Sequence, residues 1–155
     1  MKGSAEIIDC LNALLTNELT AIDQYFVQAR MLEDWGFIKL YERISHEADD
    51  ERGHADRLVK RILFFEGQPD VGSRAPLKIG SNPNEMLAND LEYELEVART
   101  LNEAIALCRK HGDNGTREML EELLRDTEDD HILWLEQQLS LIEKVGLKNY
   151  LSEQL

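Results

Sequence analysis

Apolar residues recur every three or four positions along most of the chain, which is the pattern of amphipathic helices. The first predicted helix begins after Ser4, a suitable N-cap, and runs to about Asp34. Trp35-Gly36 then marks a turn, and a second helix continues to about Glu66. The apolar stripes of these two helices are Ile7, Leu11, Leu14, Ile22, Tyr25 and Ala29, then Leu40, Ile44, Ala48, Leu58 and Ile62.

The second half of the chain repeats this arrangement. A third helix is predicted from near Pro83, a favoured first-turn residue, to about His111, and a fourth from about Thr116 to Lys144. Gly146 ends the fourth helix, and residues 147–155 are long enough for a short fifth helix. The stripes are Leu87, Leu91, Ala98, Leu101, Ile105 and Cys108, then Leu120, Leu124, Leu135, Leu139 and Ile142.

Residues 66–82 predict one long irregular connection, because Pro69 and Pro76 and three glycines lie there, with Pro83 at its end. A loop of this length normally argues against a compact domain. A four-helix bundle with a single long crossover accommodates it. The sequence therefore predicts an all-α fold over residues 1–155, a single four-helix-bundle domain with its crossover between the second and third helices and a short C-terminal fifth helix.

Composition narrows the possible partners. The net charge is −14 and the isoelectric point about 4.6, so the general field of the protein disfavours nucleic acid and acidic membranes. The two cysteines, Cys10 and Cys108, form no Cys-x-x-Cys motif, which argues against a zinc ribbon, a rubredoxin-like module or a disulfide framework. No signal peptide or membrane span is evident, and we expect a cytoplasmic protein.

A duplicated motif indicates a metal-binding site. Glu-x-x-His occurs at residues 51–54 and again at residues 128–131. Glu18 lies 33 residues before the first copy, and Glu94 lies 34 residues before the second. Positions i and i+3 share one face of a helix. Two such pairs with two further carboxylates form the ligand set of a di-iron or di-manganese centre in a four-helix bundle. The six predicted ligands are Glu18, Glu51, His54, Glu94, Glu128 and His131.

The helix face selects these residues among 31 acidic ones. Glu18 and Glu94 interrupt apolar stripes, whereas Glu92 and Glu96 fall off the stripe and should be solvated. Carboxylates that face a core are costly unless they are paired or bind metal. Two divalent cations would balance four carboxylates, and mixed oxygen and nitrogen ligands suit iron or manganese, with zinc as a competitor. The alternative is an accidental Glu-x-x-His on an exposed face, and two copies in matching register argue against it.

With these residues the sequence resembles the ferritin superfamily, and specifically the bacterioferritins, over its whole length. The resemblance rests on Asn17-Glu18-Leu19, Asp23-Gln24-Tyr25-Phe26, Asp34-Trp35-Gly36, His54-Ala55-Asp56-Arg57, Arg61-Ile62-Leu63, Met1-Lys2-Gly3 and Gly146-Leu147 with Asn149-Tyr150-Leu151. It implies iron storage in a hollow cage of twenty-four subunits. It also implies a ferroxidase centre in each subunit, where dioxygen or hydrogen peroxide oxidises Fe(II), and a ferredoxin-type reductant for iron release.

The resemblance also assigns roles. Glu18 and His54 would hold one iron and Glu94 and His131 the other, with Glu51 and Glu128 as bridges. His46 and Asp50 would form a further iron site on the inner surface; the alternative is an ordinary exposed polar pair. Tyr25 and Trp134 match aromatic residues that donate electrons in the family, although core packing explains such residues equally well.

One position departs from the bacterioferritin pattern. The methionine that ligates haem in the family corresponds to Arg52, and a guanidinium is no haem ligand. Asp49 and Asp23 would add charge to the haem pocket, and Met31 alone does not restore it. We therefore expect no haem in the homo-oligomer. The chain is similar to the haem-free subunit type, which assembles alone or together with a haem-binding bacterioferritin subunit.

Other functional classes remain as alternatives. A soluble di-iron peroxidase or oxygenase of the rubrerythrin type would use the same ligands, but its rubredoxin-like Cys-x-x-Cys tail is absent. A mini-ferritin builds its sites between subunits, whereas this chain carries all six ligands. A purely structural cage subunit has no need of the ligand set.

Overall fold

The computed structural model describes residues 1–155 and contains helices and connections but no strand. None of its helices combines the length and apolar character needed to cross a membrane. Its elements are α1 (Ala5–Asp34), α2 (Ile38–Phe64), α3 (Pro83–His111), α4 (Asn114–Asp126), the π-helical segment η1 (Thr127–Ile132), α5 (Leu133–Val145) and α6 (Leu147–Ser152).

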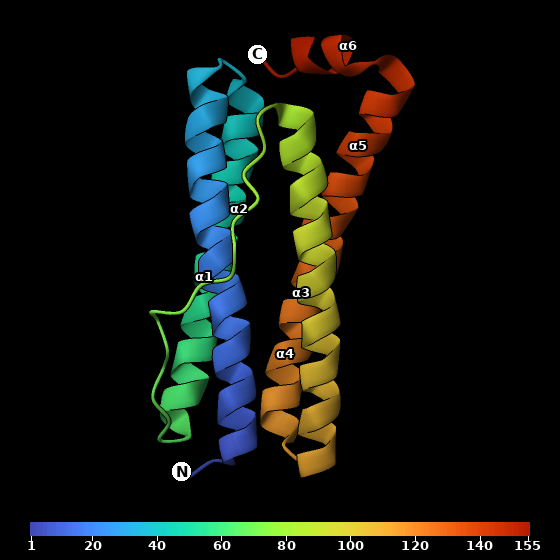
Figure 1. The fold of residues 1–155 in the computed structure, drawn as a ribbon. Coiled ribbons are helices and arrows are strands. Elements are labelled where there is room, and N and C mark those ends of the chain that lie inside the picture. The colour runs from blue at the N-terminus through green and yellow to red at the C-terminus, as the bar shows by residue number, and fades with distance from the viewer.

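The helices form two antiparallel pairs that lie side by side (Figure 1). The pair α1 and α2 packs against a second pair, in which α3 runs beside α4, η1 and α5. The short α6 lies across the end of the bundle opposite the N-terminus (Figure 1). The predicted four-helix bundle with one long crossover and a short C-terminal helix is therefore confirmed.

Local sequence explains most helix boundaries. The Asn82 side chain accepts a hydrogen bond from the backbone N–H of Glu85 at 3.0 Å, and Pro83 occupies the first turn of α3. Gly112 ends that helix in the left-handed region (φ 66°), where glycine avoids a Cβ clash. Ser4 does occupy the N-cap position of α1, but its side chain makes no capping hydrogen bond.

The hydrophobic core is divided into two clusters along the bundle. One cluster of 15 buried residues includes Leu15, Leu58 and Leu101, and the other, of 11 buried residues, includes Tyr25 and Leu40. Buried acidic and imidazole side chains lie on all four long helical segments between these clusters. The apolar packing on both sides therefore holds a polar layer at mid-bundle.

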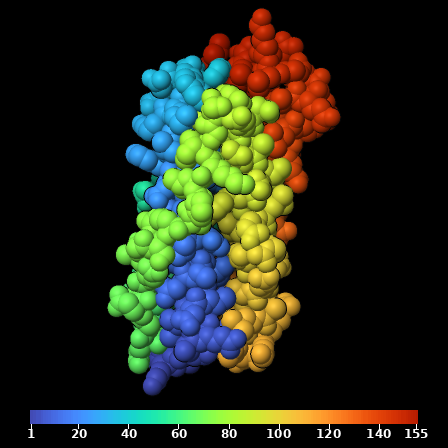
Figure 2. Space-filling view, viewed as in Figure 1, coloured from blue at the N-terminus to red at the C-terminus, as the bar shows by residue number.

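The crossover is tied to α1 by a ladder of buried polar side chains. Thr20, Gln24 and Gln28 follow one another at one-turn intervals on α1 and are each at most 1% exposed. Their side chains bond to the crossover backbone at Ala75 N (2.9 Å), Lys78 N (3.1 Å) and Ile79 O (3.0 Å). Figure 2 shows the crossover lying over the face formed by α1 and α3.

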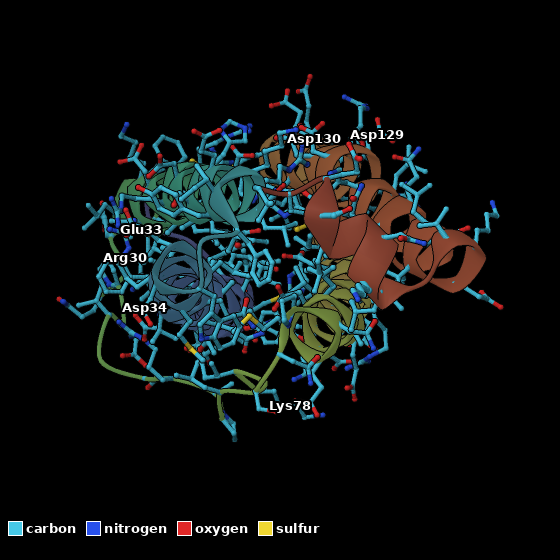
Figure 3. The ribbon with its side chains drawn as sticks, turned by 90° about the horizontal axis from the view of Figure 1, so that it is seen from above. Arg30, Glu33, Asp34, Lys78, Asp129 and Asp130 are labelled. Atoms are coloured by element: carbon cyan, nitrogen blue, oxygen red, sulfur yellow. The ribbon has the colours of Figure 1, made fainter.

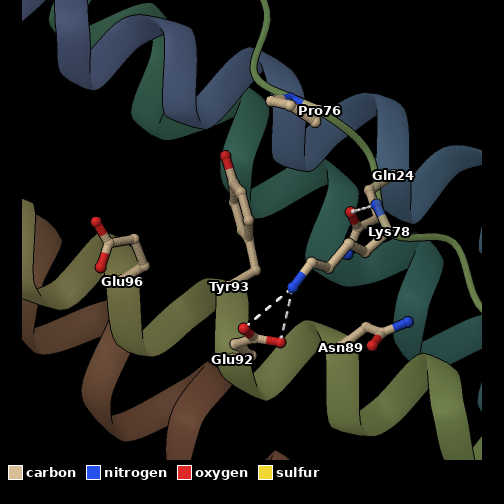
Figure 4. Close-up of a pocket in the computed structure, with 7 residues that line it drawn as sticks. All are labelled: Gln24, Pro76, Lys78, Asn89, Glu92, Tyr93 and Glu96. Atoms are coloured by element: carbon tan, nitrogen blue, oxygen red, sulfur yellow. Dashed lines mark hydrogen bonds and ion pairs between the residues drawn. The ribbon is translucent and has the colours of Figure 1, made fainter.

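The ladder reaches α3 through Asp90. Gln24 Nε2 donates to Asp90 Oδ1 at 2.8 Å, while Gln24 Oε1 accepts from the crossover. Burial raises the pKa of Asp90 to about 8, and the charges of Glu94 and Glu47 act in the same direction. A polar cavity of about 160 Å³ opens beside Gln24 under the crossover, where Lys78 pairs with Glu92 (Figure 4). The exposed position of Glu92 agrees with its place off the stripe.

The fourth helix is not continuous, and this corrects the sequence prediction. A single helix was expected from about Thr116 to Lys144, but residues 127–132 adopt π-helical hydrogen bonding between α4 and α5. A π turn holds more residues than an α turn, so the face that each later residue occupies is shifted. The apolar stripe spans the interruption because Leu120 and Leu135 are both buried on its two sides.

We predict that Gln24→Leu destabilises the protein by about 1–3 kcal/mol, because it leaves the Lys78 N–H and the buried Asp90 carboxyl without their partner. The free energy of unfolding from denaturant titration measures this loss. Asn12→Leu is the matched control, since Asn12 also bonds twice to the crossover, at Gln68 O and Asp70 N, but in solvent-exposed positions. Equal losses in the two variants would contradict the ladder's role.

We predict that Asp90→Asn changes the pH dependence of stability in the metal-free protein. The folded-state pKa of Asp90 is raised, so its stabilising contribution is complete below its ordinary pKa of 3.8 and is lost as pH rises towards 8. Asparagine resembles the neutral acid and keeps an acceptor for Gln24. The Tm of the variant should therefore match the wild type near pH 4 and exceed it increasingly towards pH 8. A constant Tm difference across this range would refute the assignment.

Candidate metal centre

Five of the six predicted ligands meet between the two core clusters. They come from four different helical elements, and each is at most 5% exposed. The five are Glu18 on α1, Glu51 and His54 on α2, Glu94 on α3 and His131 on η1. The sixth, Glu128, lies elsewhere.

The five side chains form two poles. At one pole, His54 Nδ1 lies 3.7 Å from Glu18 Oε1 and 3.4 Å from Glu51 Oε2. At the other, His131 Nδ1 lies 2.8 Å from Glu51 Oε1 and 3.2 Å from Glu94 Oε1. The two oxygens of Glu51 therefore face different histidines. Two groups suited to hold a metal ion, Glu18–Glu51–His54 and Glu51–Glu94–His131, share this one carboxylate.

The buried carboxylates and imidazoles of the centre shift one another's pKa values strongly. Burial raises the pKa of Glu18 well above its usual range, and the neighbouring charge of Glu51 raises it further. Burial alone would lower the pKa of His54, but the neighbouring carboxylates of Glu18 and Glu51 outweigh it and raise that pKa to about 11. The pKa of His131 is also raised, by Glu47, Glu51 and Glu94 against the effect of burial. Without metal, protons on the imidazoles and on Glu18 therefore reduce the net negative charge of the centre.

The donor atoms fit divalent cations. Several buried side-chain atoms of the centre have no hydrogen-bond partner, among them Glu18 Oε2, Glu51 Oε1, Glu94 Oε2 and His54 Nδ1. Buried polar atoms without partners are costly, and cations at the two poles would satisfy them. Carboxylate oxygens with imidazole nitrogens suit iron or manganese, and zinc competes for such ligands.

Glu128 is exposed, which corrects the expectation that it faces the core beside His131. The reason is the π-helical hydrogen bonding of η1. In an α-helix, positions i and i+3 share a face, but the wider turn of a π segment separates them. His131 therefore points inward while the acidic residues before it point outward. Figure 3 shows Asp129 and Asp130 at the outer edge of the bundle.

Two carboxylates that the sequence analysis missed contact the far nitrogens of the histidines. His131 Nε2 lies 2.5 Å from Glu47 Oε2, and His54 Nε2 lies 3.3 Å from Asp126 Oδ2. Glu47 could have been found, because it lies one turn before Glu51 on the buried face of α2. Asp126 has no comparable signal, since its side chain is half exposed.

The predicted inner-surface residues lie next to this second group. His46 Nε2 is 3.4 Å from Asp50 Oδ2, and His46 is exposed. The same Asp50 oxygen lies 3.5 Å from His131 Nε2. Asp50 therefore stands between an exposed and a buried histidine, and Glu47, Asp50 and His131 form a third group close enough to share an ion.

Two aromatic side chains border the centre. The Tyr25 hydroxyl donates a short hydrogen bond to Glu94, and burial raises the pKa of Tyr25 well above its ordinary value. Trp134 follows His131 by three residues and is partly exposed. Both therefore lie near the carboxylates, and Tyr25 is also part of the apolar core.

The position of the haem-ligating methionine is at the surface. Arg52 is exposed and lines a groove together with Phe26, Tyr41 and Asp49. Asp23 does not line this groove; its carboxylate pairs with Arg74 of the crossover at 2.9 Å. The groove therefore carries charges of both signs. The sequence analysis expected Arg52, Asp49 and Asp23 there, and only Arg52 and Asp49 line it.

Comparisons with known proteins agree with this arrangement. A family model described as Ferritin-like domain matches residues 8–145. The chain is 50% identical over 155 residues to a bacterial ferritin of Synechocystis sp., which covers 100% of this chain and 99% of that protein. It is 51% identical over 155 residues to a bacterial ferritin of Pseudomonas aeruginosa, with both chains covered fully (100%). It is 41% identical over 150 residues to a bacterioferritin of Rhodobacter capsulatus, which covers 97% of this chain and 92% of that protein. The chain therefore belongs to the ferritin superfamily, in the group of bacterial ferritins and bacterioferritins.

Proposed function

We propose that this protein stores iron by oxidising Fe(II) to Fe(III) at the buried centre and passing the product to a mineral core. One observation carries the proposal: the two oxygens of Glu51 face His54 and His131, so one carboxylate can bridge two ions. Glu18 and His54 would hold one Fe(II), and Glu94 and His131 the other. Membership of the ferritin superfamily supports iron storage as the overall function.

Iron is the substrate of this reaction. Each of the two Fe(II) ions gives up one electron, and dioxygen or hydrogen peroxide accepts the pair. When the ions bind, His54 and His131 release the protons that they hold in the metal-free protein, so binding should become weaker as pH falls. The apolar clusters on both sides exclude bulk water from the carboxylates.

We propose that Glu128 joins the centre when iron binds. Glu18, Glu51 and Glu94 supply three negative charges against the four positive charges of two Fe(II), and Glu128 would complete the balance. A π turn inside a helix is an irregularity that is frequent at functional sites, and a local change of its register would bring Glu128 inward. Glu128 thus acts as an adaptable sixth ligand, whereas the other five are already assembled.

The contacts of Asp50 support a path between the centre and the surface. Its carboxylate reaches towards both His131 and the exposed His46. Iron leaving the centre would pass these oxygens before it enters the mineral.

We further propose a cage of twenty-four subunits, alone or mixed with a haem-binding subunit, and a ferredoxin-type reductant for iron release. Apolar side chains that lie together at the surface support assembly, since contiguous exposed apolar patches mark interaction sites, and Leu133 and Leu141 of α5 line one surface hollow. Exposed examples are Phe26 on α1, Leu133, Leu141 and Val145 on α5, and Leu155 at the C-terminus. Identity along the full chain to bacterial ferritins favours storage over the rubrerythrin-type alternative.

We predict that Glu51→Ala and His131→Ala each reduce the initial rate of Fe(II) oxidation by about 100-fold or more, since removal of a metal-site group typically costs at least several kcal/mol of binding or catalysis. Glu128→Ala should reduce the rate about tenfold, because that residue joins an already assembled set. Stopped-flow absorbance of the ferric product measures the rates, and light scattering checks that the cage is intact.

Glu92→Ala is the matched control for this series. Glu92 lies two residues from Glu94 on α3, but it is exposed and pairs with Lys78 instead. Its oxidation rate should equal that of the wild type. Wild-type initial rates in both Glu51→Ala and His131→Ala would overturn the proposed centre, and a wild-type rate in Glu128→Ala would remove that residue from the ligand set.

We predict that the purified homo-oligomer binds no stoichiometric haem, because Arg52 occupies the ligating position and the groove around it carries charge. Titration with haem and absorption spectroscopy test this. A Soret band that saturates at one haem for every two subunits would contradict the prediction. Arg52→Met supplies the comparison, since it restores a thioether at the same position.

A further inference from the structure

Arg43 makes three contacts, one within α2 and two that join α2 to η1 and α5. Its Nε donates to Glu47 Oε1 at 2.6 Å, and its Nη2 donates to the backbone oxygen of Asp130 at 2.6 Å. Its guanidinium also stacks on the Trp134 ring, 4.6 Å from the centroid. The planar guanidinium suits these combined demands, which a lysine could not meet together. One side chain thus holds both the π segment and a buried carboxylate.

Glu47 relays this contact to the metal centre. Its side chain is 4% exposed, with one oxygen on Arg43 and the other facing His131 Nε2. A neutral imidazole carries one proton. When that proton lies on Nε2, which faces Glu47, the lone pair of Nδ1 is left towards Glu51 and Glu94. A carboxylate on the far nitrogen fixes the tautomer and orientation of a ligating histidine.

We propose that Arg43 is a positioning residue that acts through Glu47 and the η1 backbone to fix His131 for metal binding. The proposal rests on the proposed function, because it concerns a ligand of the same centre. The guanidinium holds the Glu47 side chain in place, and the bond to Asp130 fixes the π segment that carries His131.

The arrangement favours orientation over a third metal site at Glu47, Asp50 and His131. Arg43 places a permanent positive charge 2.6 Å from Glu47. A cation bound by Glu47 would be repelled by this charge, whereas the close approach of the His131 ring is compatible with it. Glu47 therefore serves the histidine and not an ion of its own.

The two histidines are held differently. His54 Nε2 faces Asp126, whose side chain is 51% exposed and has no ion pair with an arginine or a lysine. His131 is instead held by a buried carboxylate with its own guanidinium. Loss of Arg43 should consequently weaken metal binding at the pole of His131 and leave metal binding at the pole of His54 unchanged.

Co(II) titration of the full-length assembled protein tests this proposal, with visible absorption to follow each bound ion. The wild type should bind two Co(II) per subunit. Arg43→Met and Glu47→Gln should each lower the affinity for one of the two ions about tenfold or more. This is the usual effect of losing an outer partner of a ligating histidine. The double variant should lose less than the sum of the two single losses, since the two residues share the Glu47 contact.

Arg57→Met is the matched control. Arg57 also lies on α2 and pairs across to α4 through Glu122, but it contacts neither histidine. Its two Co(II) affinities should equal those of the wild type. Arg43→Lys keeps the charge near Glu47 but loses the combined contacts, so its affinity should lie between those of the wild type and Arg43→Met.

The outcomes separate the inference from the proposed function. Fewer than two Co(II) per wild-type subunit would refute the centre itself. Two Co(II) bound with unchanged affinity in Arg43→Met, or an equal loss of affinity at both ions, would refute only the role of Arg43 and leave the centre in place. If Arg43→Met fails to assemble, Arg43→Lys and Glu47→Gln decide the question, and unchanged affinity in both overturns the proposal.

Discussion

The structure depends on the burial of carboxylates and imidazoles at the middle of an apolar bundle. Glu18, Glu51 and Glu94 lie between the two hydrophobic clusters with almost no access to water. Such burial is costly unless charge of the opposite sign is present. Protons on the histidines supply part of that charge without metal, and divalent ions would replace them. Apolar clusters lie on both sides of this layer, and five of the ligands meet there without an ion.

The sequence predicted the features that depend on short-range periodicity. Helical spacing placed Glu18 and Glu94 on apolar stripes and Glu92 and Glu96 off them, and the structure agrees. Prolines and glycines located the crossover for an equally local reason, since they disfavour continued helix. The pairing of the helices followed from a known constraint, because a bundle of this size accommodates one long crossover. These inferences needed only the geometry of a regular α-helix.

The inferences that failed are those in which the helix is irregular or the contact is distant in sequence. The position of Glu128 was wrong because η1 changes the register within residues 127–132, and no local signal marks a π turn. Asp90 was missed because its partners lie on α1 and the crossover. Glu47 was missed because the sequence analysis assigned the apolar stripe to its neighbour Ala48, although Glu47 is the less exposed of the two. Its role is visible only when η1 is placed against α2.

The π segment η1 carries both an assembled ligand, His131, and the adaptable one, Glu128. It carries His131 inward and leaves Glu128 outside, so one helical irregularity determines both positions. An irregularity of this kind persists only where surrounding contacts favour it, and Arg43 provides them through the Asp130 carbonyl, Trp134 and Glu47. The same contacts that fix the histidine therefore keep the π segment in place. A change of register that brings Glu128 inward would break the Arg43 bond to the Asp130 carbonyl, while the Glu47 contact can still hold the His131 ring.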